Sequence, residues 1–238
     1  MSMNIYDNVD KIYFINLEYR KDRCSYIQNH LQTYFPDKPI EKFNAIQPQE
    51  AKLYPFVKSI CKDISKVETY PGIIGCYCSH LCLLKRLYHT YKNNSKDKFV
   101  LIFEDDTYFD DTFINVLKKP FTLKKWNILL GINPSCNIKD KPIHKISDYI
   151  KGIPQKNVKQ PHLFGTNVVI YNLNNIDKIY KQLLLIDKIK EIDYIYIYLM
   201  QDTYFFNTNY IQENKEISKS DITYDYHENN FRKFILRC

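Results

Sequence analysis

The chain has 238 residues, of which 45% are hydrophobic and 26% charged, with a formal net charge of +7. This composition excludes disordered and fibrous chains, and the length is enough to bury a sizeable core. Because the lysines are spread along the chain and form no single stripe, the positive charge favours an anionic small ligand over a nucleic-acid groove.

The amino-terminal sequence and the cysteines predict a soluble protein of a reducing, cytoplasmic compartment. The first residues contain no apolar core of signal-peptide length, and no window approaches the roughly 18 to 20 apolar residues of a membrane span. The chain has 7 cysteines, which cannot all pair with one another. Cys76 and Cys78 have C-x-C spacing, but no second Cys/His pair at zinc-finger spacing follows, so structural zinc is not expected.

Predicted strands and helices alternate through the first half of the chain. A buried strand is predicted at Lys11–Leu17, and a helix at Lys21–Tyr34 follows it. A second short strand is predicted at Glu41–Ile46, and then an irregular connection with one helical turn over Gln47–Pro71. Gly75–Tyr91 has leucines at the spacing of one helix face, which predicts a long helix.

The second half continues this alternation. Phe99–Phe103 is a run of apolar residues too short for a buried helix and typical of a strand covered on both faces. The pattern, with no repeat and no linker, predicts one α/β domain of Rossmann-like type with a mixed, mostly parallel sheet flanked by helices. The remaining predicted elements are a helix at Thr112–Lys118, a strand at Trp126–Leu130, a polar loop to Gln160, a strand at Leu163–Tyr171, a helix at Leu173–Ile186, and either a helix or a strand at Glu191–Met200.

Three acidic residues, Glu104, Asp105 and Asp106, follow the predicted strand at Phe99–Phe103. Carboxylates gathered at the carboxyl end of a central strand repel one another, and ligands of open α/β sheets bind at that edge. The predicted partner of this cluster is therefore a hard divalent ion, Mg²⁺ or Mn²⁺, with coordination positions left for a phosphate-bearing substrate. The alternative is a solvated acidic turn that caps the following helix near Asp111.

Four separated blocks of the sequence form a further pattern. The blocks are YFINLEYRKDR (Tyr13–Arg23), GIIGCYCSHLCLLKRL (Gly72–Leu87), VLIFEDD (Val100–Asp106), and a looser set of FGTNVVIYN (Phe164–Asn172), IDYIY (Ile192–Tyr196) and IQENKEISKSDI (Ile211–Ile222). In this order they resemble the family-25 glycosyltransferases, which include the lipooligosaccharide and the collagen hydroxylysine galactosyltransferases. Two positions depart from the family pattern: Ile73 or Ile74 stands where the family has an acid before Gly-Cys, and Tyr194 replaces the second acid of its Asp-Glu pair.

The resemblance implies a GT-A-type fold with a DxD-like metal motif. It also implies inverting transfer of a hexose, galactose or glucose, from a UDP-sugar to a glycan or a hydroxylated side chain, with Mn²⁺ or Mg²⁺ as cofactor. Asp106 and Glu104 are the predicted metal site, in which Asp106 touches the ion and Glu104 its bound water or the ribose. The predicted single domain over residues 1–238 divides into a nucleotide-sugar and metal half (11–131), an acceptor half (132–222) and a tail (223–238).

Further donor-site residues are predicted from the resemblance together with the chemistry of each side chain. Arg20 and Arg23 follow the first strand where a helix begins, so guanidinium groups and backbone amides would face a phosphate; the alternative is a pair of surface cations. Asn16 is predicted to bond the uracil or the ribose, or else to form a turn. The other predicted donor-site residues are Gly75, Ser79, His80, Asp105, Gln212, Ser220 and Asp221.

An inverting transfer needs a base for the proton of the acceptor hydroxyl, and a carboxylate is the usual choice. Asp193 is the predicted base, with Asp202 in reserve. The predicted partners are a nucleotide-sugar donor and a carbohydrate or glycoprotein acceptor, with no nucleic acid. Two other functions stay open: a catalytically silent member that binds a glycan or a protein, and a metal-dependent phosphohydrolase or nuclease. The Lys-, Asn- and Ile-rich composition suggests an AT-rich viral or microbial source.

Overall fold

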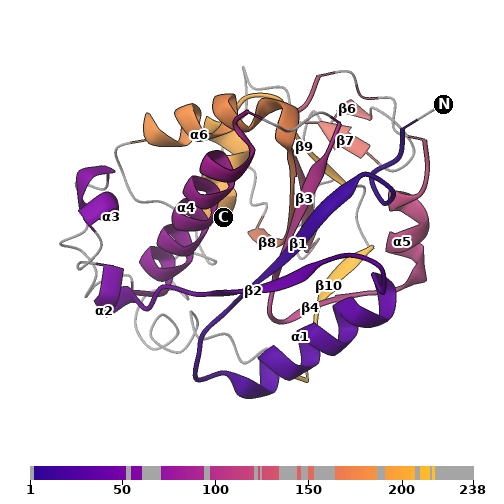
Figure 1. Ribbon diagram of the computed structural model, residues 1–238, viewed down its shortest axis with the longest axis horizontal. Helices are drawn as coiled ribbons and strands as arrows, with labels where there is room; N and C mark the ends of the chain where they lie inside the picture. The colour runs from indigo at the N-terminus through magenta and orange to yellow at the C-terminus, as the bar shows by residue number, and fades with distance from the viewer. Residues whose placement is uncertain are drawn as a thin grey trace, which may run out of the picture.

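Figure 1 shows the protein as a computed structural model, which describes residues 3–51, 55–60, 71–93, 97–120, 123, 125–133, 144–145, 150–152, 164–186, 191–206, 210–214 and 216–217. Strands and helices alternate as expected for an α/β protein. In chain order they are β1 (Val9–Asn16), α1 (Lys21–Tyr34), β2 (Ile40–Asn44), α2 (Pro48–Ala51), α3 (Pro55–Ile60), α4 (Pro71–Tyr91), β3 (Phe99–Glu104), β4 (Thr107–Phe109), α5 (Asp111–Leu117), β5 (Ile128–Asn133), β6 (His144–Lys145), β7 (Ile150–Gly152), β8 (Phe164–Asn172), the 3-10 turn η3 (Leu173–Asn175), α6 (Ile176–Leu184), α7 (Ile192–Tyr194), the π-helical turn η4 (Ile195–Leu199), β9 (Thr203–Phe206) and β10 (Ile211–Glu213).

The described strands form one 8-stranded sheet in the order β2-β1-β3-β8-β5-β9-β7-β6, and β10 pairs separately with β4. Strands β2, β1, β3, β5, β9 and β6 run in one direction, while β8 and β7 run against them. The fold is thus the predicted Rossmann-like domain with a mixed, mostly parallel sheet. The carboxyl ends of β1, β2 and β3 meet at one edge, where an open α/β sheet binds its ligands.

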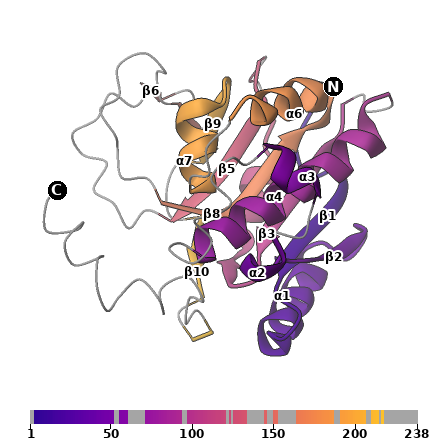
Figure 2. The same cartoon turned by 90° about the vertical axis from the view of Figure 1, so that its left-hand side faces the viewer.

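Helices cover both faces of the sheet, as Figures 1 and 2 show. Within β3, Phe99, Leu101 and Phe103 join the core beneath α1 and α5, whereas Val100 and Ile102 join the core beneath α4 and α6. This alternation follows from the period of two along a strand. Burial on both faces explains why β3 has an unbroken apolar run.

Most of the predicted elements agree with the structure, and α1 has the predicted bounds. The open choice at Glu191–Met200 is settled as helix, with α7 followed by the π-helical turn η4. The continuous polar loop predicted up to Gln160 is wrong, because β6 and β7 lie within it and extend the sheet. These two strands are 2 and 3 residues long, too short to leave a periodic pattern in the sequence.

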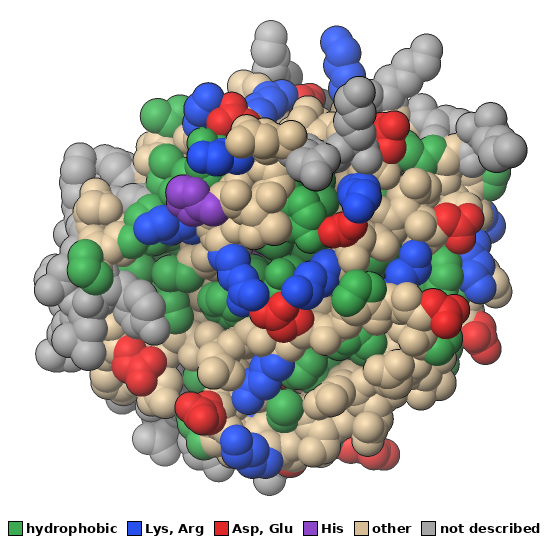
Figure 3. All heavy atoms as spheres, in the orientation of Figure 1, with side chains coloured by type: hydrophobic (Ala, Val, Ile, Leu, Met, Phe, Trp, Pro, Cys, Tyr) green, Lys and Arg blue, Asp and Glu red, His purple; other side chains and the backbone are tan. Residues whose placement is uncertain are grey.

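The surface of the protein carries both signs of charge. On the face shown in Figure 3, lysines and arginines are interspersed with carboxylates. Among the described helices, none combines the length and the apolar character that crossing a bilayer requires. None of the described cysteines Cys24, Cys76, Cys78 and Cys82 takes part in a disulfide.

Candidate active site

Glu104 ends β3, and Asp105 and Asp106 form the turn that follows it; all three line a cavity of about 360 Å³. Asp105 and Asp106 are buried, and Glu104 is half-buried. The alternative prediction was that the acidic triplet caps the helix that follows it. That cap is instead Asp110, which accepts a hydrogen bond from the backbone amide of Thr112 at the start of α5. The triplet is therefore brought together at the ligand-binding edge of the sheet.

Arg23 and Asn16 hold Asp105 in place. The Arg23 guanidinium donates to Asp105 at 2.9 Å and lies 3.2 Å from Asp106 Oδ2, while Asn16 Nδ2 donates to Asp105 at 2.7 Å. Burial raises the pKa of Asp105, although Arg23 and Asn16 oppose that rise. Asn16 therefore acts on a carboxylate and does not line the cavity, whereas Arg23 does.

The two predicted arginines have different surroundings: Arg23 lies within α1, and Arg20 precedes it. Arg23, in the first turn of α1, is 5% exposed and joins the cavity wall. Arg20, one position before the helix, donates to Asp22 at 3.0 and 3.2 Å and to the Ile217 carbonyl at 3.3 Å. The structure thus brings Arg23 into the cavity wall and places Arg20 outside it.

The carboxyl group of Glu104 has a strongly raised pKa. Burial and then the charge of Asp106 raise the pKa of Glu104 to about 8. The Thr166 hydroxyl, at the start of the antiparallel strand β8, donates to Glu104 at 2.6 Å and opposes this rise. The buried carboxylate of Asp193 adds a smaller repulsion, so it lies within electrostatic range of Glu104.

Helix α4 forms the opposite wall of the cavity. A Cβ atom at Gly75 would lie 3.0 Å from the Ile46 carbonyl and 3.3 Å from the Pro48 ring, so glycine permits the close approach of the loop after β2. The Ser79 hydroxyl donates to the Gly75 carbonyl at 2.6 Å and accepts from the Ile46 amide at 2.8 Å. Both residues line the cavity, but their observed contacts hold the helix against that loop.

His80 lies one helical turn after Cys76, and both side chains face the same cavity. Its Nδ1 is 3.3 Å from the Tyr196 hydroxyl, and its Nε2 has no hydrogen-bond partner among the described residues. Burial lowers the pKa of His80 to about 4, so the ring is neutral at physiological pH. Burial, with the charges of Glu104 and Asp193, raises the pKa of the Cys76 thiol.

The segment at the end of β10 contacts the acidic triplet. The Asn214 amide donates to the Asp106 carbonyl at 2.7 Å, directly after β10 pairs with β4. Gln212 lies on β10 with an exposed side chain and does not line the cavity. Ser220 and Asp221 lie outside the described residues.

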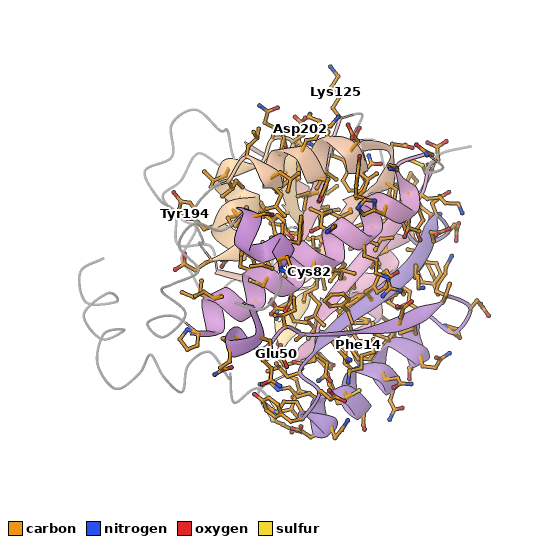
Figure 4. All side chains as sticks on the ribbon, turned by 60° about the vertical axis from the view of Figure 1, so that its left-hand side comes forward. Phe14, Glu50, Cys82, Lys125, Tyr194 and Asp202 are labelled. Carbon is orange, nitrogen blue, oxygen red and sulfur yellow. The ribbon has the colours of Figure 1, made fainter. Side chains whose placement is uncertain are left out.

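Asp202, the reserve base, lies away from the cavity. It precedes β9, at the amino ends of the parallel strands, and pairs with Lys178 at 2.7 Å. Figure 4 shows Asp202 near the top of the molecule and Glu50, next to the cavity-lining residue Gln49, towards the bottom. Of the two predicted bases, only Asp193 is brought near the acidic triplet.

The sequence model of glycosyltransferase family 25, described as an LPS biosynthesis protein, matches residues 9–151. The chain belongs to this family. The match spans 143 residues, well over half of the chain, and contains the first three blocks of the predicted resemblance. The fourth block lies beyond it. A search of curated proteins gave no match to the chain.

Membership of family 25 makes the protein a glycosyltransferase, with a sugar donor and an acceptor as its partners. Residues of the site that were not predicted from the sequence include Cys76, Thr166, Tyr196 and Tyr19. The spacing of Cys76 and His80, four residues apart on a predicted helix, was the available signal for the first. Thr166 and Tyr196 reach the site through tertiary packing, and no local pattern marks them.

Proposed function

We propose that this glycosyltransferase transfers a hexose, galactose or glucose, from a UDP-sugar to a hydroxyl group of a glycan or a side chain, with inversion and with Mn²⁺ or Mg²⁺ as cofactor. The observation that carries the proposal is the set of carboxylates at the carboxyl edge of β3, beside a cavity of about 360 Å³. Membership of family 25 supports the transfer of a sugar.

The residues present fit a hard divalent ion. Glu104 and Asp106 offer oxygen ligands, the type that Mg²⁺ and Mn²⁺ prefer. Arg23 brings a single positive charge to the triplet, so negative charge remains in excess. Burial and then the charge of Asp106 raise the pKa of Glu104, and a bound cation would offset both effects. When bound, the ion would neutralise the charge that develops on the departing diphosphate.

The chain's own residues provide the other parts of the reaction. Arg23 lines the cavity and offers its guanidinium group to a phosphate oxygen, while Asp105 fixes its orientation. Tyr19 lines the same cavity with 59% of its surface exposed, and its ring offers a face on which a uracil can stack. Asp193, buried beside Glu104, accepts the proton of the attacking hydroxyl.

The decisive variant is Asp106→Asn, compared with Asp37→Asn, which changes an exposed acid in the turn after α1. UDP release from UDP-galactose and UDP-glucose is measured with and without Mn²⁺, and UDP binding is followed by calorimetry. We expect Asp106→Asn to lose metal-dependent turnover and the metal-dependent gain in UDP affinity. Metal-dependent turnover that survives in Asp106→Asn contradicts the assigned role. UDP and Mn²⁺ binding without turnover in the unmodified protein indicates a silent donor-binding protein.

A further inference from the structure

A second set of ligand atoms lies in the cavity beside the carboxylates. One ligand atom from each of Cys76, His80 and Glu104 lies within 4.8 Å of the other two. Cys76 and His80 come from one face of α4, and Glu104 comes from the end of β3. All three residues line the cavity, so an ion from solution has a path to them.

His80 is oriented as a metal-binding histidine should be. Its side chain is 1% exposed, and Nδ1 faces the Tyr196 hydroxyl at 3.3 Å. The Tyr196 hydroxyl is in turn hydrogen-bonded to Tyr171. Metal-binding histidines usually donate their second ring N–H to such a partner, which fixes the tautomer. Nε2 is then the nitrogen left for a ligand, and among the described residues it has no partner.

We propose that Cys76, His80 and Glu104 bind a thiophilic divalent cation, Zn²⁺ in preference to Mg²⁺ or Mn²⁺. A sulfur, a nitrogen and an oxygen ligand are the kinds of donor that zinc accepts, whereas magnesium and manganese favour oxygen. Tetrahedral zinc would set the three ligand atoms about 3.4 to 3.6 Å apart. Since they lie within 4.8 Å of one another, closing the site requires shifts of about 1 Å, within reach of side-chain rotation.

This site differs from the carboxylate site of the proposed function in its ligands. Three protein ligands would leave a fourth tetrahedral position for a water molecule or another ligand. Glu104 is a ligand in both proposed sites, so its carboxylate binds either the zinc ion or the magnesium or manganese ion at any one time. The zinc site depends only on these three side chains, and it stands whether or not the protein uses a UDP-sugar.

Spectroscopy with Co²⁺ tests the site without any assay of activity. Metal-free protein under reducing conditions is titrated with Co²⁺, and the thiolate-to-cobalt charge-transfer band in the near ultraviolet is recorded. Zn²⁺ is then added to displace the cobalt, which gives the Zn²⁺ affinity. We expect the unmodified protein to show the band and to lose it on addition of one equivalent of Zn²⁺. An unmodified protein with no such band overturns the proposal.

The variant Cys76→Ser identifies the thiolate, and Cys82→Ser is its control on the same helix, at the half-buried residue labelled in Figure 4. Cys82 does not line the cavity. We expect Cys76→Ser to lose the charge-transfer band and to weaken Zn²⁺ binding by more than about tenfold, while Cys82→Ser changes neither. Equal bands and affinities in the two variants overturn the proposal.

Tyr196→Phe tests the same site without removing a ligand. The substitution keeps the buried ring but removes the hydroxyl that faces His80 Nδ1. We expect the cobalt band to persist and the Zn²⁺ affinity to fall by about tenfold, the effect typical of losing an outer hydrogen bond to a metal-binding histidine. Circular dichroism confirms that each variant is folded. An unchanged Zn²⁺ affinity in folded Tyr196→Phe contradicts the assigned role of His80.

Discussion

The two walls of the cavity use their polar atoms differently. On the wall formed by β3 and α1, charged groups meet one another: Arg23 lies between Asp105 and Asp106, and Glu104 stands beside them. On the α4 wall, the Ser79 hydroxyl is engaged by backbone groups that hold the helix in place. The charged wall is therefore suited to recognising a ligand by its charge, whereas Ser79 on the α4 wall shapes the space that the ligand enters.

The largest expected effect concerns the predicted base. Asp193→Asn removes the carboxylate near Glu104, and we expect turnover to fall by about 100- to 10,000-fold while UDP binding is kept. The matched control is Asp202→Asn, at the opposite edge of the sheet, where asparagine tolerates the left-handed backbone with φ of 56°. Steady-state kinetics measures both. Equal turnover in the two variants would remove Asp193 from the mechanism.

The next prediction tests whether the charged wall holds the fold together. Arg23→Ala leaves Asp105 buried without its guanidinium partner, and we expect the free energy of unfolding to fall by about 3 to 5 kcal/mol. Arg20→Ala breaks the contact with exposed Asp22, and we expect a loss of about 1 kcal/mol or less. Urea unfolding of both variants gives the two values. A similar loss in both variants would show that the buried pair of Arg23 and Asp105 stabilises the fold no more than the exposed pair of Arg20 and Asp22.

A smaller effect is expected on the α4 wall. Ser79→Ala leaves the buried amide of Ile46 without its acceptor, which costs about 1 to 3 kcal/mol of unfolding free energy. Ser25→Ala, at an exposed position of α1, serves as the control and should change stability by less than about 0.5 kcal/mol. Thermal unfolding measures both variants. If Ser79→Ala unfolds like its control, the hydroxyl does not hold the loop.

The last prediction concerns a pH dependence that arises at Glu104. Its pKa is higher in the folded protein, at about 8, than the ordinary value of 4.5, so the folded state binds more protons. Metal-free protein should therefore lose stability as the pH rises from 4.5 to about 8. Glu104→Gln removes this loss, and we expect its free energy of unfolding to exceed that of the unmodified protein above that range. Unfolding measured at several pH values tests this, and parallel curves for the two proteins would contradict it.

Local patterns in the sequence were sufficient for much of the fold. The helical period gave α1 its bounds, and the apolar run gave β3, because both signals arise within a single element. The short strands β4 and β10 carry no such signal, since each has 3 residues and pairs with a distant partner. Pairing between remote segments was thus the part of the fold that the sequence did not predict.

The amino-acid sequence by itself determined the alternation of strands and helices, the acidic triplet after β3 and the resemblance to family 25. Tertiary structure alone decided which residues meet there. It separated Asp193 from Asp202, although they are close in sequence, because the turn of α7 and η4 carries the chain between opposite edges of the sheet. It also brought Cys76 and His80 to Glu104, because α4 packs across the sheet face above β3. Strand order and helix packing set the distances between these residues, and no local sequence pattern predicts either of them.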